Sequence, residues 1–265
     1  MRVKVIQLMM QPLVCAFFSL VLLVLIGFSI PAQGEQLENK SVKKPNFVWI
    51  ISEDNSPEYL RLYNRQYGAA MPNLEQMAKN GITYQNAYSN APVCSTARST
   101  LALGVHAPQA GTMHHRAFAK AKYNSSLQTI YKLMKDAGYY VTNNVKTDFN
   151  FSQPSNLGFS ESSKTAHWKN KSEQQPFFHI KTFNTTHESK LMFPVTDVQN
   201  KPTKHDPAKV KLAPYHPDTP VFRYTQARYL DMHQTLDKQI GEVLKELKEA
   251  GELENTFIFY FPLTL

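Results

Sequence analysis

Short apolar runs alternate along this chain with stretches in which apolar residues recur every three or four positions. The apolar runs predict strands at 47–51, 82–88, 139–142, 176–183 and 257–261. The run at 257–261, like those at 47–51 and 176–183, is continuous enough for a central strand buried on both faces. The helical spacing predicts helices at 72–80, 98–103, 127–137 and 223–250. Strands alternating with helices predict an α/β fold with a mostly parallel central sheet flanked by helices.

Two of the helix starts carry local signals. A hydroxyl at Ser125 or Ser126 can cap the helix that follows, so we place its N-terminus there. The helix at 98–103 follows a loop at 90–93 and ends at Gly104. Cys94 therefore lies at or near the N-terminus of this helix. The dipole and free amide groups at that end of a helix favour an anion.

The first 34 residues have the pattern of a signal peptide. Arg2 and Lys4 precede an apolar stretch at 13–30, and small residues follow at 31–34. A retained membrane anchor is the alternative, because about 18 apolar residues can span a bilayer. We favour cleavage, which predicts an exported protein, periplasmic or extracellular, without stable membrane association. Residues 35–44 are polar and predict a disordered linker, so the folded domain occupies 45–265.

Charge and cysteine content narrow the function. Without residues 1–34 the net charge falls from +8 to +6, because 27 basic residues remain against 21 acidic ones. This modest excess suits an anionic substrate or a solvated face, and no motif suggests a nucleic-acid partner. Cys15 leaves with the signal peptide, so Cys94 has no internal disulfide partner. Cys94 is a buried apolar residue, an intermolecular bridge or a reactive group.

Polar residues follow three of the predicted strands. Glu53 and Asp54 come directly after the first strand, Lys146 follows the strand at 139–142, and His187 follows the strand at 176–183. Because sites in open α/β sheets gather at the carboxyl ends of strands, we expect these side chains to meet near Cys94. Carboxylate oxygens bind hard cations such as calcium or magnesium. The alternatives are an acidic turn, a surface lysine and a turn histidine.

Four motifs occur in order along the chain after residue 44. They are Pro45-Asn46 with an apolar strand and paired acids, Cys94-x-x-x-Arg98 with Ser99 and Gly104, Gly138-Tyr139 followed by Lys146, and Pro176-Phe177-Phe178 leading to His187. Together these motifs resemble the sulfatase family of the alkaline-phosphatase-like superfamily, whose members use a formylglycine made from cysteine. The likeness covers nearly the whole chain after residue 44.

The resemblance implies a role for each site residue. Cys94, oxidised to formylglycine by a maturation enzyme and then hydrated, would be the nucleophile, and Arg98 would stabilise the hydrate. A calcium ion, or alternatively magnesium, would be bound by Glu53, Asp54 and residue 94. The sulfate of a small-molecule or glycan substrate would be contacted by Lys146, His187 and His115. The loop that holds His114 and His115 lines a pocket or forms a surface turn.

The sequence departs from the family pattern in four places. Thr96 stands where the family has Pro or Ala, Glu53 where Asp is usual, and Asp148 where a histidine contacts the nucleophile. After the strand at 257–261 the family continues with Ser-Asp-His or Asp-Asn, which completes its metal site. Here the sequence ends with 262–265, so we expect a truncated chain that lacks those ligands and the C-terminal subdomain.

Three functional hypotheses follow. The first is hydrolysis of sulfate esters, most simply of a sulfated carbohydrate. The second is a catalytically inactive fragment, in which case the 265-residue chain has little or no turnover. The third is a metal-dependent phosphatase or phosphodiesterase of the same superfamily, against which Cys94 and Arg98 argue.

Overall fold

A computed structural model describes residues 43–124 and 126–263, which form one parallel sheet with helices on both faces. The strand order is β3-β2-β4-β1-β5, and every pairing in the sheet is parallel. The strands are β1 (Asn46–Ser52), β2 (Tyr140–Asn144), β3 (Glu161–Ser162), β4 (Phe177–Phe183) and β5 (Thr256–Pro262). The α/β fold with a parallel central sheet is therefore confirmed. The predicted signal peptide and most of the predicted linker lie outside the described residues.

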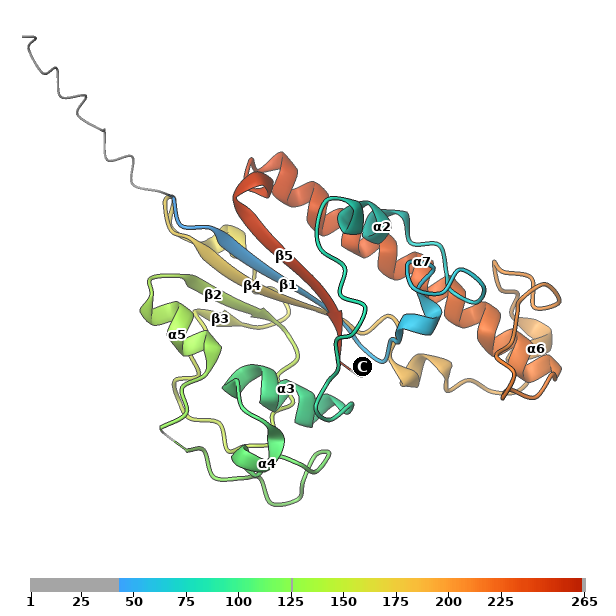
Figure 1. Cartoon of the computed structure of the whole chain (residues 1–265), viewed down its shortest axis with the longest axis horizontal. Coiled ribbons are helices and arrows are strands. Elements are labelled where there is room, and N and C mark those ends of the chain that lie inside the picture. Colours follow the sequence, from blue (N-terminus) through green and yellow to red (C-terminus); the bar gives the residue numbers. More distant parts are fainter. Residues whose placement is uncertain (1–42, 125, 264–265) are drawn as a thin grey trace, which may run out of the picture. The chain divides into compact units, whose positions relative to one another are not determined.

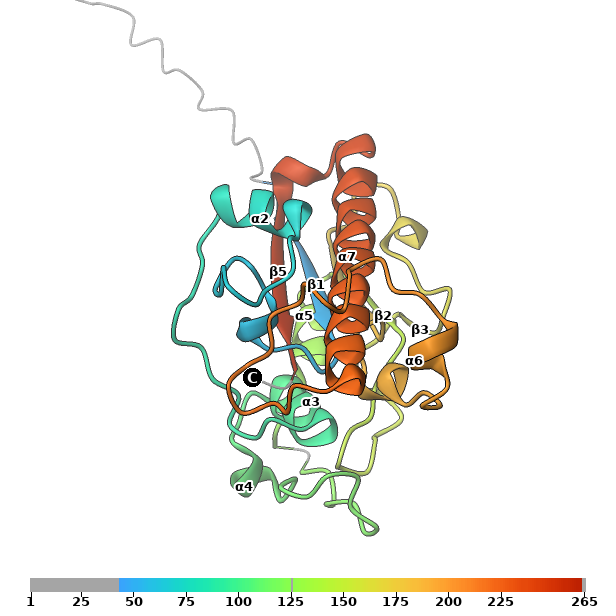
Figure 2. The same cartoon turned by 90° about the vertical axis from the view of Figure 1, so that its right-hand side faces the viewer.

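The helices form two layers, one on each face of the sheet (Figures 1 and 2). One layer contains α2 (Pro72–Lys79) and α7 (Pro220–Glu249), and the other α3 (Cys94–Leu103), α4 (Ala107–Ala110) and α5 (Ile130–Asp136). The connections contain α6 (Asp197–Asn200), η1 (Pro57–Tyr59), η2 (Trp168–Asn170), η3 (Glu188–Leu191) and η4 (Leu253–Asn255). No helix in these described segments combines the length and the apolar character needed to cross a membrane.

The sequence of β1 is continuously apolar because both faces of this strand are covered. Val48 and Ile50 point into the core beneath α2 and α7, whereas Ile51 belongs to the core beneath α3 and α5. Trp49 lies on that second face too, and its ring packs edge-on against Phe178 of β4 at 4.9 Å. A strand with helices over both faces has no solvent side on which to place polar residues.

Helix α7 begins three residues before its predicted start at 223, because local signals at both ends fix its length. The Thr219 hydroxyl accepts a hydrogen bond from the Phe222 amide, Pro220 occupies the first turn, and Gly251 follows with a left-handed φ of 68°. One turn of α7 also anchors α2. The Asp237 carboxylate accepts hydrogen bonds from the amides of Asn73 and Leu74, which stabilises the N-terminus of α2.

Three predicted elements were wrong in type or position. Residues 82–88 form a loop rather than a strand, and Ile82 is 81 % exposed there because the loop has no neighbouring strand in the described chain. Helix α5 starts later than expected. Thr129 caps it, while the Asn124 side chain accepts from the Ser126 amide and forms a turn; Ser125 lies outside the described residues. Strand β5, predicted as a central strand, has a neighbour on one side only among the described residues.

Candidate active site

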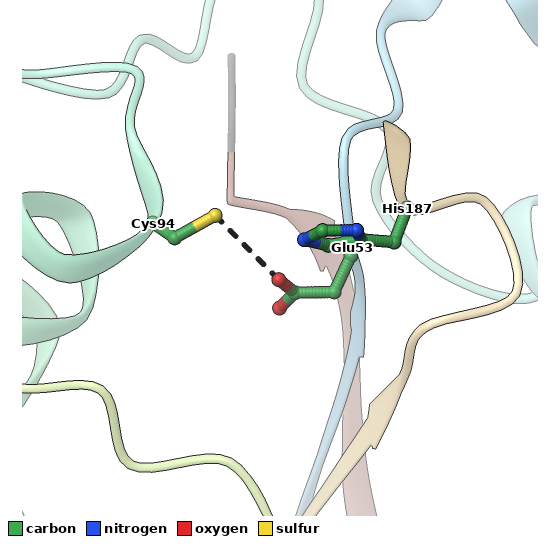
Figure 3. A group of neighbouring side chains, drawn as sticks. All are labelled: Glu53, Cys94 and His187. Atoms are coloured by element: carbon green, nitrogen blue, oxygen red, sulfur yellow. Dashed lines mark hydrogen bonds between the residues drawn. The ribbon is translucent and has the colours of Figure 1, made fainter. Parts of the chain in front are cut away.

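The carboxyl ends of β1, β2 and β4 meet the N-terminus of α3, and the predicted site residues gather there. Glu53 follows the last residue of β1, Lys146 comes two residues after β2, and His187 follows β4. Parallel strands end at the same edge of a sheet, which is why residues so distant in sequence lie together. Cys94, the first residue of α3, faces this edge (Figure 3).

Glu53 is the centre of the group. Its fully buried carboxylate accepts from Arg98 Nη2 at 2.6 Å, through Oε1, and from Lys146 Nζ through Oε2. Burial opposes ionisation of Glu53, but Arg98 and Lys146 outweigh it and hold the pKa of Glu53 below its ordinary value. The site therefore has an ionised carboxylate between two cations.

Asp54 is held beside Glu53 by its backbone and its side chain. Its φ of 44° lies in the left-handed region, which is uncommon for a residue other than glycine. The Tyr229 hydroxyl donates to the Asp54 carbonyl, and the Glu188 amide donates to Asp54 Oδ2 at 2.9 Å. His187 Nε2 lies 3.7 Å from the same oxygen. These contacts direct the carboxylate towards Cys94, whose Sγ is 3.9 Å from Asp54 Oδ1.

Cys94 is only 6 % exposed, and its Sγ lies 3.6 Å from Glu53 Oε2. Burial, followed by the negative charge of Glu53, raises the pKa of the Cys94 thiol. The group is therefore a protonated thiol near neutral pH, which is a weaker nucleophile than a thiolate. Thr96, two residues further along α3, is also buried and donates from its hydroxyl to the Met113 carbonyl at 3.3 Å.

Arg98 links α3 to the sheet. Besides its ion pair with Glu53, it donates to the Lys146 carbonyl at 2.9 Å and to Thr182 Oγ1 at 3.2 Å. Its Nε has no hydrogen-bond partner among the described atoms. The resemblance implied that Arg98 stabilises the nucleophile directly, whereas the contacts seen here join it to Glu53 and to the neighbouring strand ends.

Histidine 115 lies at the exposed rim of the site. Its Nδ1 is 3.2 Å from Ser95 Oγ, so it contacts the residue next to Cys94. Asp148, where the family pattern has a histidine, pairs with Arg116 at 3.0 Å and lies 3.8 Å from Lys146 Nζ. His114, the other half of the histidine pair, is exposed.

A buried polar network supports the site from behind, and sequence reasoning missed it. His233 on α7 places Nε2 2.9 Å from Asn55 Oδ1 and Nδ1 2.8 Å from the Tyr229 carbonyl. Asn55 in turn donates to the Tyr260 hydroxyl of β5 at 2.9 Å. Burial lowers the pKa of His233 to about 4, so its ring is neutral. Tyr229 and His233 are four residues apart, and polar residues on the core side of a helix are a signal for such a network.

Three side chains could hold a metal ion. The ligand atoms of Glu53, Cys94 and His187 all lie within 4.8 Å of one another (Figure 3). The carboxylates of Glu53 and Asp54 are the kind of donor that hard cations prefer, whereas sulfur and imidazole nitrogen suit borderline metals. As a donor set, the acidic pair thus fits the divalent cation that the sequence predicted.

Solved structures define the class of this fold. A putative sulfatase from Bacteroides fragilis superposes with a TM-score of 0.65, at 16 % identity, over 83 % of this chain and 62 % of its own. A phosphonate monoester hydrolase from Silicibacter pomeroyi superposes with a TM-score of 0.64, also at 16 % identity, with the same coverage. Such likeness shows that the chain shares the fold of these proteins.

The sequence comparisons identify the family within that class. The Sulfatase family model matches residues 45–261, and the chain therefore belongs to the sulfatase family. It is 29 % identical to an ulvan-active sulfatase of Formosa agariphila over 88 % of this chain and 46 % of that protein. It is 25 % identical to human N-acetylgalactosamine-6-sulfatase over 82 % of this chain and 49 % of that protein. The chain thus spans about half the length of these relatives.

Proposed function

We propose that this site serves the hydrolysis of sulfate esters, with residue 94 as the nucleophile. The observation that carries the proposal is the placement of Cys94 at the N-terminus of α3, against Glu53 and beside Lys146 and His187. A sulfate ester needs positive groups around its oxygens as charge moves to the leaving group. The ulvan-active and N-acetylgalactosamine-6-sulfatase relatives support a sulfated carbohydrate as the substrate.

The proposal includes conversion of Cys94 to formylglycine by a maturation enzyme. A buried thiol with a raised pKa is a poor nucleophile as it stands, which supports a modified residue at this position. Once formed, the hydrated aldehyde would supply an oxygen nucleophile. Arg98 acts through Glu53, because its guanidinium holds Oε1 of that carboxylate and leaves Oε2 facing residue 94.

Calcium, with magnesium as the alternative, is the proposed cation. Glu53 and Asp54 would hold it together with the converted residue 94, and bound there it would draw charge from the sulfate oxygens. Their carboxylates lie within 4 Å of the same sulfur, with 3.6 Å for Glu53 and 3.9 Å for Asp54. Both side chains therefore point at one position in front of α3.

The remaining residues are assigned to the substrate. The Lys146 side chain is 23 % exposed, so its ammonium can reach a sulfate while it neutralises Glu53. The His187 side chain is 20 % exposed, and we assign it to protonation of the leaving oxygen. His115 at the rim is positioned to contact the rest of the substrate. Export, which rests on the apolar segment at 13–30, would bring the site to polymeric substrates outside the cell.

The test is release of sulfate from a model aryl sulfate by the purified chain, with residue 94 checked by mass spectrometry. We expect slow release that needs calcium and is abolished by Cys94→Ala. The rate should be low because Glu53 and Asp54 provide only part of the about six to eight oxygen ligands that calcium takes. Release that survives Cys94→Ala or a chelator would contradict the proposal.

The same assay separates the alternatives. Faster release of phosphate from an aryl phosphate, or of alcohol from a phosphonate ester, would favour the phosphatase hypothesis, for which the phosphonate monoester hydrolase fold gives limited support. No release from any ester by a folded chain with a converted residue 94 would favour the inactive fragment.

A further inference from the structure

A groove lies between two loops outside the candidate active site. One wall is the segment 58–67, which follows β1, and the other is the segment 210–218, which leads into α7. The groove contains two adjoining cavities of about 390 and 120 Å³, which share the lining residues Tyr67, Lys211 and His216. The larger cavity falls within the range of about 300–1,000 Å³ found for ligand pockets. Figure 2 shows the second segment in orange beside η1 in blue.

Two tyrosines in contact connect the groove to the candidate active site. Tyr59, which lines the smaller cavity, packs edge-on against Tyr229 with ring centroids 4.7 Å apart. The Tyr229 hydroxyl donates in turn to the Asp54 carbonyl. The groove therefore lies close enough to the site for one extended ligand to occupy both.

The groove contains polar groups that the fold leaves without a partner. The Gln226 side chain is only 7 % exposed and lines the smaller cavity, yet its amide forms no hydrogen bond with any described residue. The hydroxyls of Tyr59 and Tyr67 have no partner in that part of the chain either. A buried amide that has given up water without gaining a partner costs free energy, so a ligand that restores its hydrogen bonds is bound favourably.

The charges of the lining nearly cancel. Arg223 pairs with Asp218 through Nη2 at 2.7 Å, and its Nη1 donates to three backbone carbonyls between 207 and 210. Of the other charged groups in the described lining, Lys211 and Glu58 have no ion pair. A nearly neutral groove with one available ammonium suits a sugar that has a single anionic group better than it suits a densely charged ligand.

Aromatic rings supply faces on which a sugar can pack. Tyr215 is 74 % exposed, and its ring lies edge-on to that of His216 with centroids 4.6 Å apart. The C–H groups on one face of a sugar pack against such rings, while amides and hydroxyls bind its hydroxyl groups. We propose that the groove binds a further sugar unit of a sulfated glycan whose ester lies at residue 94, with Gln226 contacting its hydroxyls and Lys211 its anionic group.

This inference deepens the proposed function and rests on it, because it takes the substrate to be a sulfated glycan. It adds a preference for chain length. A single sugar at residue 94 leaves the groove empty, whereas a longer chain fills both sites. Affinity should therefore increase with the number of sugar units.

Calorimetric titration of the full chain with glycans of two lengths tests the proposal. The protein carries Cys94→Ala, so that no substrate is turned over, and the buffer contains calcium. The probes are a disaccharide and a hexasaccharide of chondroitin 6-sulfate. We expect the hexasaccharide to bind at least about tenfold more tightly, which corresponds to one or two additional hydrogen bonds.

Matched variants locate this gain in the groove. Tyr215→Ala and Gln226→Leu should each weaken hexasaccharide binding about three- to tenfold, towards the affinity of the disaccharide. Lys211→Gln should have an effect of similar size. Lys209→Gln is its control, because Lys209 lies two residues away, is 84 % exposed and does not line the groove, so binding should be unchanged. Melting temperatures establish that each variant is folded.

The proposal is overturned if the hexasaccharide binds no more tightly than the disaccharide, if folded Tyr215→Ala and Gln226→Leu keep the gain, or if Lys211→Gln and Lys209→Gln have equal effects. Sulfate release from an aryl sulfate depends on the groups around residue 94 and not on the groove. Failure of the groove proposal is therefore distinguishable from failure of the sulfatase proposal.

Discussion

Glu53 shows how one residue can determine the electrostatics of a site. Its carboxylate reaches both Arg98 and Lys146. The pair with Arg98 is nearly inaccessible to solvent, since the two side chains are 0 % and 4 % exposed. Breaking a buried pair leaves an uncompensated charge, which costs far more than the pair itself contributes.

We therefore expect Glu53→Gln to lower the free energy of unfolding by about 3–5 kcal/mol. Urea denaturation in the presence of a chelator measures this without a contribution from bound metal. The matched control is Asp148→Asn, which removes the partner of the half-exposed Arg116 and should cost less than about 1 kcal/mol. Equal losses in the two variants would contradict the assigned importance of burial.

At the scale of single residues, the positions of the site residues could be predicted from the sequence, but the side chains that they contact could not. Glu53, Lys146 and His187 each follow an apolar strand, and parallel topology brings such positions together. The side-chain contacts of Arg98 depend on the distance from α3 to the sheet, which no local pattern encodes. The Tyr229 hydroxyl beneath Asp54 was missed for the same reason, because its helix lies 175 residues further along the chain.

At the scale of elements, β4 carries a polar residue inside its apolar run. His179 is buried beneath η2, and its Nδ1 lies 2.7 Å from Thr142 Oγ1 of β2. Burial, with smaller effects of His167 and Lys181, lowers the pKa of His179 from 6.5 to about 3. The folded strand therefore holds a neutral imidazole near neutral pH.

This predicts a loss of stability in acid. In the unfolded chain His179 takes up a proton near pH 6.5, whereas in the folded chain it does so only near pH 3, so stability falls as the pH drops through this interval. Between pH 7 and pH 5 the loss should be roughly 2 kcal/mol. Urea denaturation at pH 7 and pH 5 measures the free energy of unfolding. We expect its decrease between these pH values to be smaller in His179→Gln than in the unsubstituted protein, by this amount. An equal pH dependence in the two proteins would contradict the assignment.

The wrong strand predictions also have an explanation at this scale. A continuous apolar run predicts a strand covered on both faces, but it does not say what lies beside it. Residues 257–261 do form β5, yet Phe257 is 57 % exposed and Phe259 45 %, and of the phenylalanines on that face only Phe261 packs against the core beneath α3 and α5. Within the described segments, the apolar positions at 82–88 have no partner strand, and they form a loop.

At the scale of the whole molecule, β5 leaves one side of the sheet open. In the described part of the chain it pairs with β1 alone, so the amide and carbonyl groups along its outer side face away from the sheet. Exposed phenylalanines beside an unpaired edge are a template for strand addition by another chain. Figure 1 shows β5 at this margin of the sheet.

We expect the purified chain to self-associate through this edge, and Phe257→Lys to reduce the dimers and larger species. Sedimentation velocity at matched concentrations measures the change. Ile82→Lys is the control, since it replaces an even more exposed apolar residue in a loop without a strand edge. A similar reduction in both variants would show that general surface hydrophobicity, and not the edge, drives the association.

The burial of the first turns of α3 has a consequence for the timing of modification. Cys94 and the four residues after it are all buried, and the last of them, Arg98, forms an ion pair with Glu53. An enzyme that reads this stretch as an extended peptide would have to unwind the helix and separate that ion pair. Any such enzyme therefore has to act on the nascent or unfolded chain. A chain that folds first would no longer be a substrate for such an enzyme.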